Sequence, residues 1–365
     1  MTPTKIIFAG GGTAGHVEPA LAVARAWRRE RPADECIFLG TSSGLESTLV
    51  PQAGFTLSLI PKVVMPRTLN FDLMRFPIRF FGSIRAARHV ITGAKVVVGF
   101  GGYVCASAYL AARLEKVPIV IHEANAKVGW ANRFGSLFTH HLAITHPVEK
   151  GAFMNALITG VPLREDVQES YVRAVRDWKL ERVRAKESLG WNPDALTILI
   201  MGGSQGSISL NAVIAAAVSE LSSKGIYMLH SVGAKNELPK TTLHYKPVSY
   251  ISDISSAYLA ADLVIARSGA VTVAEVGALG RYALFVPLPV GNGEQMKNAL
   301  QLVEAGRACI VKQEIFTSKW LISNIDSLLA TARSTPIDGS GADIDAAAKI
   351  VALMDHAISQ KGRKS

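Results

Sequence analysis

Three glycine-rich segments stand where a short β-branched run gives way to a helical pattern, and segments of this kind are suited to binding phosphate groups. They are Gly10–Gly15, Gly101–Gly102 and Gly202–Gly206. Glycine lets backbone N–H groups approach a phosphate at the start of a helix, where the helix dipole favours negative charge. A single segment could serve only the tight packing of a strand against a helix. Three segments of one style favour phosphate binding.

The first segment matches the pattern G-x-G-x-x-G, but its surroundings count against two common classes of enzyme. A dinucleotide-binding dehydrogenase needs Asp or Glu at the end of the second strand to hold the ribose, and here Leu39 is followed by Gly40 and Thr41. A kinase-type P-loop needs lysine at the position where His16 stands. The pattern alone is therefore weak evidence for either class.

Patterns typical of metal sites are also weak. His140, His141 and His146 could ligate a metal, but surface or core histidines are the commoner outcome. The only Asp-x-Asp, at 343–345, precedes the last helical pattern, where carboxylates cap the helix and complement its dipole. The three cysteines lie far apart without a CxxC pair, which argues against a disulfide framework and favours a reducing compartment. We expect neither a metal nor a cofactor.

The elements that must position the glycine segments follow an alternating pattern of strands and helices. Strands are expected at Lys5–Ala9, Cys36–Leu39, Val96–Phe100, Ile119–Ile121, Thr197–Met201, Asp262–Ala266 and Ala283–Val286, with helices at about 18–29, 104–114, 210–221 and after Gly269 to about Leu279. Such alternation predicts an α/β fold with parallel sheets covered by helices on both faces. Because the chain has 365 residues and glycine segments in each half, we expect two Rossmann-like domains with the site in the cleft between them.

The domain boundaries are expected after residues 163 and 343. A terminal helix at about 344–358 is expected to pack back on the first domain. The highly charged run that follows Arg164 and extends to Gly190 is interpreted as a solvated helix. The uncharged interval between Lys95 and Arg113 approaches the length of a membrane span, but its glycines indicate strand, loop and helix instead. We expect no spanning helix and no signal peptide.

The order of the motifs resembles that of the MurG-type N-acetylglucosamine transferases of glycosyltransferase family 28, and the match covers nearly the whole chain. The motifs are Gly11–Val17, Gly101–Tyr103, His122–Asn125, Gly202–Gly206 and Arg267–Glu275. The resemblance implies a GT-B fold in which the first domain binds mainly the acceptor and the second mainly UDP-N-acetylglucosamine. It further implies an inverting transfer, without a metal, that forms the β-1,4 bond to undecaprenyl-diphosphate-linked muramoyl-pentapeptide in peptidoglycan synthesis.

The same resemblance implies roles for single residues. The acceptor diphosphate would be contacted by Gly101, Gly102 and Tyr103. Contacts to the donor fall to Thr13, Ala14, Gly15, Asn125, Arg164, Ser204, Ile251, Ala270, Val271, Thr272, Val273, Ala274, Glu275 and Gln295. Among these, Arg164 would supply a mobile positive charge and Glu275 would accept from both ribose hydroxyls. In isolation Glu275 would be interpreted as a helix-surface carboxylate.

The catalytic base is left open between two residues. His16 is the base or an acceptor ligand by resemblance, and histidine is a common general base. Glu123 could be the base or could orient His16, and Asn125 would contact the donor sugar or the acceptor hydroxyl. Three departures from the family pattern are Ala14 for glycine, Ala124 for glutamine and Glu294 for the first of two glutamines.

The formal charge of +10 indicates an anionic partner. By resemblance this partner is the substrate and the anionic cytoplasmic leaflet, not nucleic acid, and we expect a peripheral protein at the cytoplasmic side of the cell membrane. The segment 62–88 carries the groups that such docking needs. Its apolar residues are Phe71, Leu73, Met74, Phe76, Ile78, Phe80, Phe81 and Ile84, and its arginines are Arg67, Arg75, Arg79, Arg85 and Arg88. An ordinary buried helix with snorkelling arginines is the alternative.

Two other functions remain open from the sequence. A non-hydrolysing UDP-N-acetylglucosamine 2-epimerase would share the donor and the two-domain architecture but would need no lipid acceptor. A catalytically silent scaffold at the membrane would have no reason to keep Glu275, Ser204 and Arg164 together.

Overall fold

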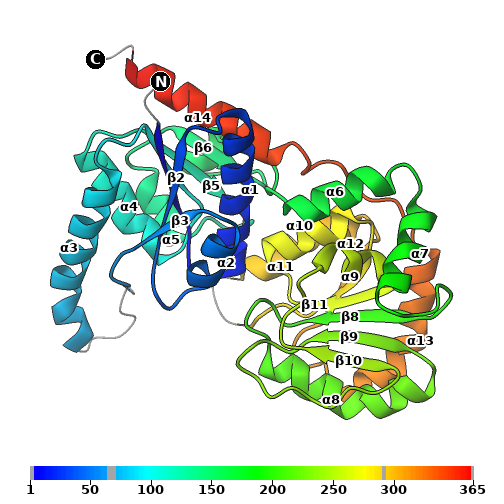
Figure 1. Ribbon diagram of the computed structural model, residues 1–365. Coiled ribbons are helices and arrows are strands. Elements are labelled where there is room, and N and C mark those ends of the chain that lie inside the picture. Colours follow the sequence, from blue (N-terminus) through cyan, green and yellow to red (C-terminus); the bar gives the residue numbers. More distant parts are fainter. Residues whose placement is uncertain (1–3, 64–70, 290–292, 363–365) are drawn as a thin grey trace. The chain divides into compact units, whose positions relative to one another are not determined.

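The computed structural model describes residues 4–63, 71–289 and 293–362 of the chain (Figure 1). Two compact units form, one from Met1–Arg164 with Ile344–Ser365 and the other from Glu165–Asp343. The divisions expected from the sequence lie after residues 163 and 343. Arg67 of the expected docking segment lies outside the described residues, as do the side chains of residues 71–75.

The first unit is built on a parallel sheet with strand order β3-β2-β1-β4-β5-β6-β7. The strands are β1 (Lys5–Ala9), β2 (Glu35–Gly40), β3 (Thr56–Leu59), β4 (Val96–Gly99), β5 (Ile119–Glu123), β6 (His141–Ile144) and β7 (Leu157–Ile158). The helices are α1 (Ala14–Glu30), α2 (Glu46–Gln52), α3 (Phe71–Ile91), α4 (Tyr103–Leu114), α5 (Trp130–Gly135), the 3₁₀ helix η1 (Ala152–Asn155) and α14 (Ala346–Gly362). The central strands are apolar on both faces because helices cover both.

Alternating residues of β1 divide the core of this unit into two layers. Ile7 and Ala9 face α3, α4 and α5, whereas Ile6 and Phe8 face α1, α2 and α14. The terminal helix α14 packs beside α1 and contributes Ile350 to the second layer (Figure 1). The end of the chain therefore completes the core of the first unit.

The second unit repeats this architecture with strand order β10-β9-β8-β11-β12-β13. The strands are β8 (Thr197–Met201), β9 (Tyr227–Ser231), β10 (Tyr245–Val248), β11 (Leu263–Ala266), β12 (Tyr282–Phe285) and β13 (Ala308–Ile310). The helices are α6 (Glu165–Ala174), α7 (Trp178–Ser188), α8 (Ile208–Ser223), α9 (Ile254–Ala260), α10 (Ala270–Ala278), α11 (Glu294–Asn298), α12 (Leu300–Glu304) and α13 (Ser318–Ser334). Helices α8 and α13 cover one face of the sheet.

Both sheets reverse their strand order at one point, between β1 and β4 in the first unit and between β8 and β11 in the second. In open parallel sheets, ligands bind beyond the carboxyl ends of the strands at this point. The four loops that leave these strands contain Gly10–Thr13, Gly101–Gly102, Gly202–Gly206 and Arg267–Gly269. The expected fold, two Rossmann-like units in one α/β chain, is confirmed.

The uncharged interval after Lys95 forms β4, a loop and α4, as predicted. In the part of the chain that the structure describes, no helix has both the length and the hydropathy to cross a membrane.

The prediction of one solvated helix for the charged run before Gly190 is wrong. The run forms two helices, α6 and α7, separated at residues 175–177. Glu181 and Lys186 are buried, because α7 packs its inner side against the unit and ties these groups to other charged side chains.

Candidate functional site

Two glycine loops of the first unit lie against each other at the switch point. Gly101 and Gly102 have φ angles of 96° and 87°, which L side chains rarely adopt. A Cβ atom on Gly102 would stand 2.5 Å from the carbonyl oxygen of Gly11. Glycine is therefore required here both by the backbone conformation and by the close approach of the loop after β1.

His16 lies in the first turn of α1, and the glycine loops orient its ring. Its Nδ1 is 3.1 Å from the carbonyl oxygen of Gly11. A carbonyl can only accept, so Nδ1–H donates, and in the neutral ring the lone pair is then on Nε2. A Cβ atom on Gly101 would stand 3.1 Å from that Nε2, so glycine leaves the edge of the ring uncrowded. The arrangement suits a general base that acts through Nε2.

Glu46, which belongs to none of the sequence motifs, anchors the first glycine loop. Its fully buried carboxylate accepts from the N–H groups of Gly12 (2.8 Å) and Thr41 (2.9 Å) and from the Thr41 hydroxyl (2.9 Å). The N–H of Gly12, which the motif would offer to a phosphate, thus donates to the protein's own carboxylate. Because Glu46 is 34 residues from Gly12, no local pattern could reveal this contact.

Both carboxylate oxygens of Glu123, the other candidate base, accept hydrogen bonds from the loop that follows it. Its buried Oε1 accepts from the backbone and side-chain N–H groups of Asn125, and Oε2 accepts from Gly129 N and Asn132 Nδ2. The neighbouring His122 donates from Nε2 to the carbonyl of Gly160, and burial lowers the pKa of His122 to about 4. The geometry therefore favours His16 as the base.

We expect Glu123→Ala to lower the free energy of unfolding by about 1–3 kcal/mol or more, since the N–H donors of Asn125, Gly129 and Asn132 would lose their acceptor. Urea unfolding measures the effect. Glu123→Gln, which keeps an acceptor oxygen, should lose less stability and retain measurable transfer. A Gln variant of wild-type stability but without activity would instead identify Glu123 as the base.

The remaining residues expected at the site in the first unit are Thr13, Ala14, Gly15, Tyr103 and Arg164. Thr13 precedes α1, and its hydroxyl lies 3.4 Å from His16 Nδ1. Ala14 and Gly15 begin α1, and the half-buried Tyr103 begins α4. Arg164 lies within this unit with its Nε 3.9 Å from Glu18 of α1.

One of the three histidines weighed above as metal ligands, His141, packs against another ring. The His141 ring packs edge-on against that of His356, with centroids 5.6 Å apart. Among the residues that the structure describes, no three His, Cys, Asp or Glu side chains gather as a metal site would require.

In the second unit, the loop after β8 leads into α8. The N–H of Gly206 donates to the carbonyl of Gly203 (2.9 Å), which closes the loop into a turn, and Ser204 lies half-buried within it. Ser207 caps α8, its hydroxyl accepting from Leu210 N at 3.4 Å. The dipole of this 16-residue helix therefore points its positive end at the loop.

Arg267 places a buried positive charge beside this helix terminus. Its Nη2 donates to the hydroxyls of Ser207 and Ser209, each at 2.9 Å, and to Gln313 Oε1 at 2.6 Å. Its Nη1 donates to the carbonyls of Val286 and Pro287. This role of Arg267 could not be predicted from its motif, because its partners come from the start of α8 and from the loops after β12 and β13.

The other expected donor residues lie on the same side of the second unit. Glu275 is buried in α10, where its Oε2 accepts from the Tyr258 hydroxyl at 3.1 Å. The α10 residues Ala270, Val271 and Val273 are buried, and Thr272 and Ala274 are half-buried. Ile251 is buried before α9, and Gln295 Oε1 accepts from Leu288 N at 3.0 Å.

The three departures from the family pattern also have places in the structure. Ala14 is the first residue of α1, Ala124 is buried just after β5, and Glu294 is the half-buried first residue of α11. A carboxylate in the first turn of a helix complements the helix dipole. The position of Glu294 is therefore compatible with its own helix.

Comparison with known proteins identifies both units. The glycosyltransferase family 28 N-terminal domain matches residues 6–144, and the family 28 C-terminal domain matches residues 197–351. The UDP-N-acetylglucosamine--N-acetylmuramyl-(pentapeptide) pyrophosphoryl-undecaprenol N-acetylglucosamine transferase of Streptomyces coelicolor is 44% identical over 332 residues, 89% of each chain. The crystal structure of Acinetobacter baumannii MurG is 26% identical, with a TM-score of 0.68 over 97% of this chain and 100% of that one.

A UDP-N-acetylglucosamine 2-epimerase from Neisseria meningitidis also aligns, with a TM-score of 0.59 over 97% of this chain and 100% of that one. Its identity is 12%, so the likeness extends to the fold alone. The epimerase alternative gains no support from it. The two matched domain models and the 44% identity show that the chain belongs to glycosyltransferase family 28, among its MurG-type members.

Proposed function

We propose that the chain transfers N-acetylglucosamine from UDP-N-acetylglucosamine to undecaprenyl-diphosphate-linked muramoyl-pentapeptide, a step of peptidoglycan synthesis. The observation that carries this function is the 44% identity, over 89% of both chains, to a transferase of that name. The test is transfer of radiolabelled sugar from UDP-N-acetylglucosamine to a short-chain lipid-linked acceptor, with and without chelator. We expect labelled product in both arms.

In this reaction the acceptor hydroxyl oxygen bonds to the anomeric carbon while the bond from that carbon to the diphosphate breaks. We assign the hydroxyl proton to Nε2 of His16, because Nδ1–H is held by the Gly11 carbonyl. We assign three residues to the acceptor diphosphate. Gly101 and Gly102 adjoin the His16 ring, and Tyr103 starts α4. Asn125, oriented by Glu123, is assigned to the reacting sugar.

The departing UDP diphosphate carries negative charge that the second unit is arranged to receive. Backbone N–H groups of Gly202–Gly206, the amino end of α8 and Ser204 would hold it, with the buried guanidinium of Arg267 close behind. Arg164 is proposed as a further cation that reaches the diphosphate during transfer. Glu275 is proposed to accept from the ribose hydroxyls, Ile251 to border the uracil, and Gln295 to reach the sugar hydroxyls.

We further propose that α3 docks the protein peripherally on the anionic cytoplasmic leaflet. Four of the apolar side chains that the structure describes in this helix lie on two different sides. Phe80 and Ile84 pack on the core, whereas Ile78 and Phe81 are 77% and 69% exposed. Arg85 is exposed on the same side at helical spacing from Ile78. Exposed apolar groups beside a cation are suited to the headgroup boundary of an anionic membrane.

The double variant Ile78→Ser/Phe81→Ser is expected to weaken sedimentation with phosphatidylglycerol vesicles at least about tenfold, because each buried side chain contributes roughly 1.5–3 kcal/mol. Arg85→Glu should weaken binding further and remove the preference over phosphatidylcholine. Leu243→Ser is the matched control, since Leu243 is also 77% exposed but lies in the second unit. Unaltered binding in the double variant, or an equal loss in the control, would remove α3 from the docking surface.

A further inference from the structure

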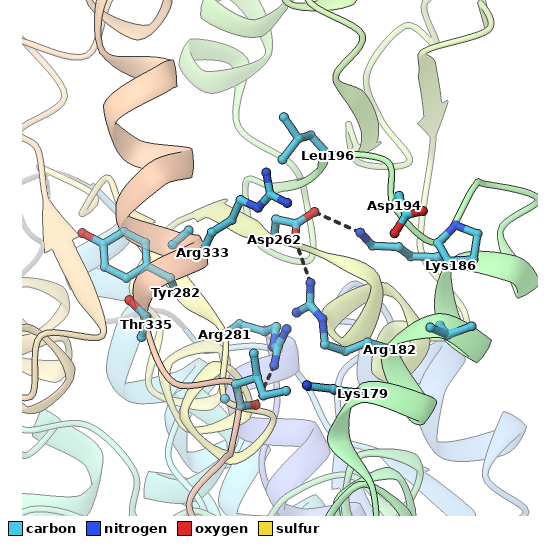
Figure 2. Close-up of a pocket in the computed structure, with 15 residues that line it drawn as sticks. Lys179, Arg182, Lys186, Asp194, Leu196, Asp262, Arg281, Tyr282, Arg333 and Thr335 are labelled. Atoms are coloured by element: carbon cyan, nitrogen blue, oxygen red, sulfur yellow. Dashed lines mark hydrogen bonds and ion pairs between the residues drawn. The ribbon is translucent and has the colours of Figure 1, made fainter.

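A cavity of about 300 Å³ opens at the amino edge of the second sheet (Figure 2). Leu196, Asp262 and Arg281 line it, and each directly precedes a parallel strand, β8, β11 or β12. The loops assigned to the donor leave the carboxyl ends of these same strands. The cavity is therefore on the opposite edge of the sheet from the proposed donor site, and the transfer mechanism does not use it.

The cavity is lined by more cations than acids. Helix α7 supplies Lys179, Arg182 and Lys186, whose spacing of three and four residues places them on one side of the helix. Arg281 comes from the start of β12 and Arg333 from the end of α13. These five cations meet two acids, Asp194 and Asp262.

One of the two carboxylates, that of Asp262, already accepts four hydrogen bonds within the protein. Asp262 accepts from Arg182 Nη2 (2.7 Å), from Lys186 Nζ (3.1 Å) and from the backbone and hydroxyl of Thr197. Burial lowers the pKa of Lys186, and the charges of Arg182 and Arg333 add to that lowering although Asp262 opposes it. The cations that line the cavity therefore repel one another, although Asp262 neutralises part of their charge.

Within the described ranges, no carboxylate forms an ion pair with the other cations. Arg281 is 2% exposed, and its guanidinium donates to the carbonyls of Leu279, Ala261 and Ile337. At the rim, the exposed Lys179 and Arg333 form no ion pair with any residue that the structure describes. A buried cation at the floor and two exposed cations at the rim could all act on one bound anion.

We propose that this cavity is a binding site for a small, multiply charged anion of the phosphate class, separate from the donor site. Arginine guanidinium groups match phosphate oxygens, and rim lysines add positive charge without fixed geometry. The volume is at the lower end of that of small-molecule sites, which suits a free phosphate compound of about the size of pyrophosphate. Such a ligand would neutralise the excess positive charge that Asp262 leaves.

The test is calorimetric titration of the full-length protein with inorganic pyrophosphate in the presence of saturating UDP, which occupies the donor diphosphate site. We expect saturable binding of one pyrophosphate per chain. Lys179→Ala and Arg333→Ala should each weaken it about tenfold or more, since each removes a charge-assisted contact. Both side chains are exposed, so the variants should fold and keep wild-type transfer activity.

Arg176→Ala is the matched control, because Arg176 is an exposed arginine just before α7 that does not line the cavity. Absence of binding to the wild type, full affinity in the Lys179→Ala/Arg333→Ala double variant, or an equal loss in Arg176→Ala would each overturn the proposal. A parallel arm with phosphatidylglycerol vesicles separates a lipid headgroup from a free anion. If the double variant loses vesicle binding while pyrophosphate never binds, the soluble ligand is refuted. None of these outcomes affects the assigned transferase function.

Discussion

Replacing His16 with alanine is expected to lower kcat about 10²–10⁴-fold while leaving KM for UDP-N-acetylglucosamine nearly unchanged. Proton removal by a positioned base acts mainly in the transition state, so its loss should appear in kcat and not in donor binding. The structure supports this role because Nδ1 is fixed by the Gly11 carbonyl and Nε2 is left as the acceptor. Steady-state kinetics with both substrates varied provides the measurement.

Two comparisons separate catalysis by His16 from a structural role. Added imidazole should restore part of the activity of His16→Ala, since a small base can occupy the space of the missing ring. Thr13→Ala should have little effect on kcat, because the Thr13 hydroxyl is 3.4 Å from Nδ1 and the Gly11 carbonyl remains, whereas loss of a donor contact by Thr13 would appear in the donor KM. A defect confined to the acceptor KM, without rescue, would make His16 a ligand of the acceptor and not the base.

The fold was predictable from the sequence where buried strands adjoin glycine segments, whereas the buried strands β6 and β9 were not predicted. Lys5–Ala9 and Thr197–Met201 were predicted with the bounds that β1 and β8 have, because their apolar runs end at glycine loops. The edge strands β3 and β10 were not predicted. Their residues are partly exposed, and β10 contains Lys246 and Pro247. An edge strand tolerates such residues, but they interrupt the apolar pattern from which a strand is predicted.

The candidate site was predictable where its residues lie in contiguous loops, and not where it depends on distant partners. The glycine loops and His16 stand next to predicted strand ends. By contrast, the contact of Glu46 with the first loop and that of Arg267 with Ser207 join residues 34 and 60 positions apart. The basic cavity was not predicted for the same reason. Which side of α7 faces inward follows from the ion pairs of Arg182 and Lys186 with Asp262, which is distant in the sequence.

Glu275→Ala is expected to raise the donor KM and to lower kcat/KM about 10²–10⁴-fold, because two charge-assisted bonds to the ribose, each worth roughly 1.5–3 kcal/mol, would be lost. The structure adds a condition to this prediction. Glu275 is fully buried with Tyr258 donating to Oε2, so the carboxylate must be uncovered or must rotate to receive a ribose. Initial rates at varied donor and saturating acceptor test the expectation.

A donor that lacks the ribose 2′-hydroxyl distinguishes recognition from packing. If Glu275 accepts from that hydroxyl, the wild type should use the 2′-deoxyuridine donor at least about tenfold less well, and Glu275→Ala should hardly distinguish the two donors. Tyr258→Phe removes one internal hydrogen bond to Oε2, so it should keep the discrimination and leave the donor KM equal or lower. If Glu275→Ala discriminates as strongly as the wild type and loses only thermal stability, the carboxylate serves the packing of α10 against Tyr258, and the ribose must find its acceptor elsewhere.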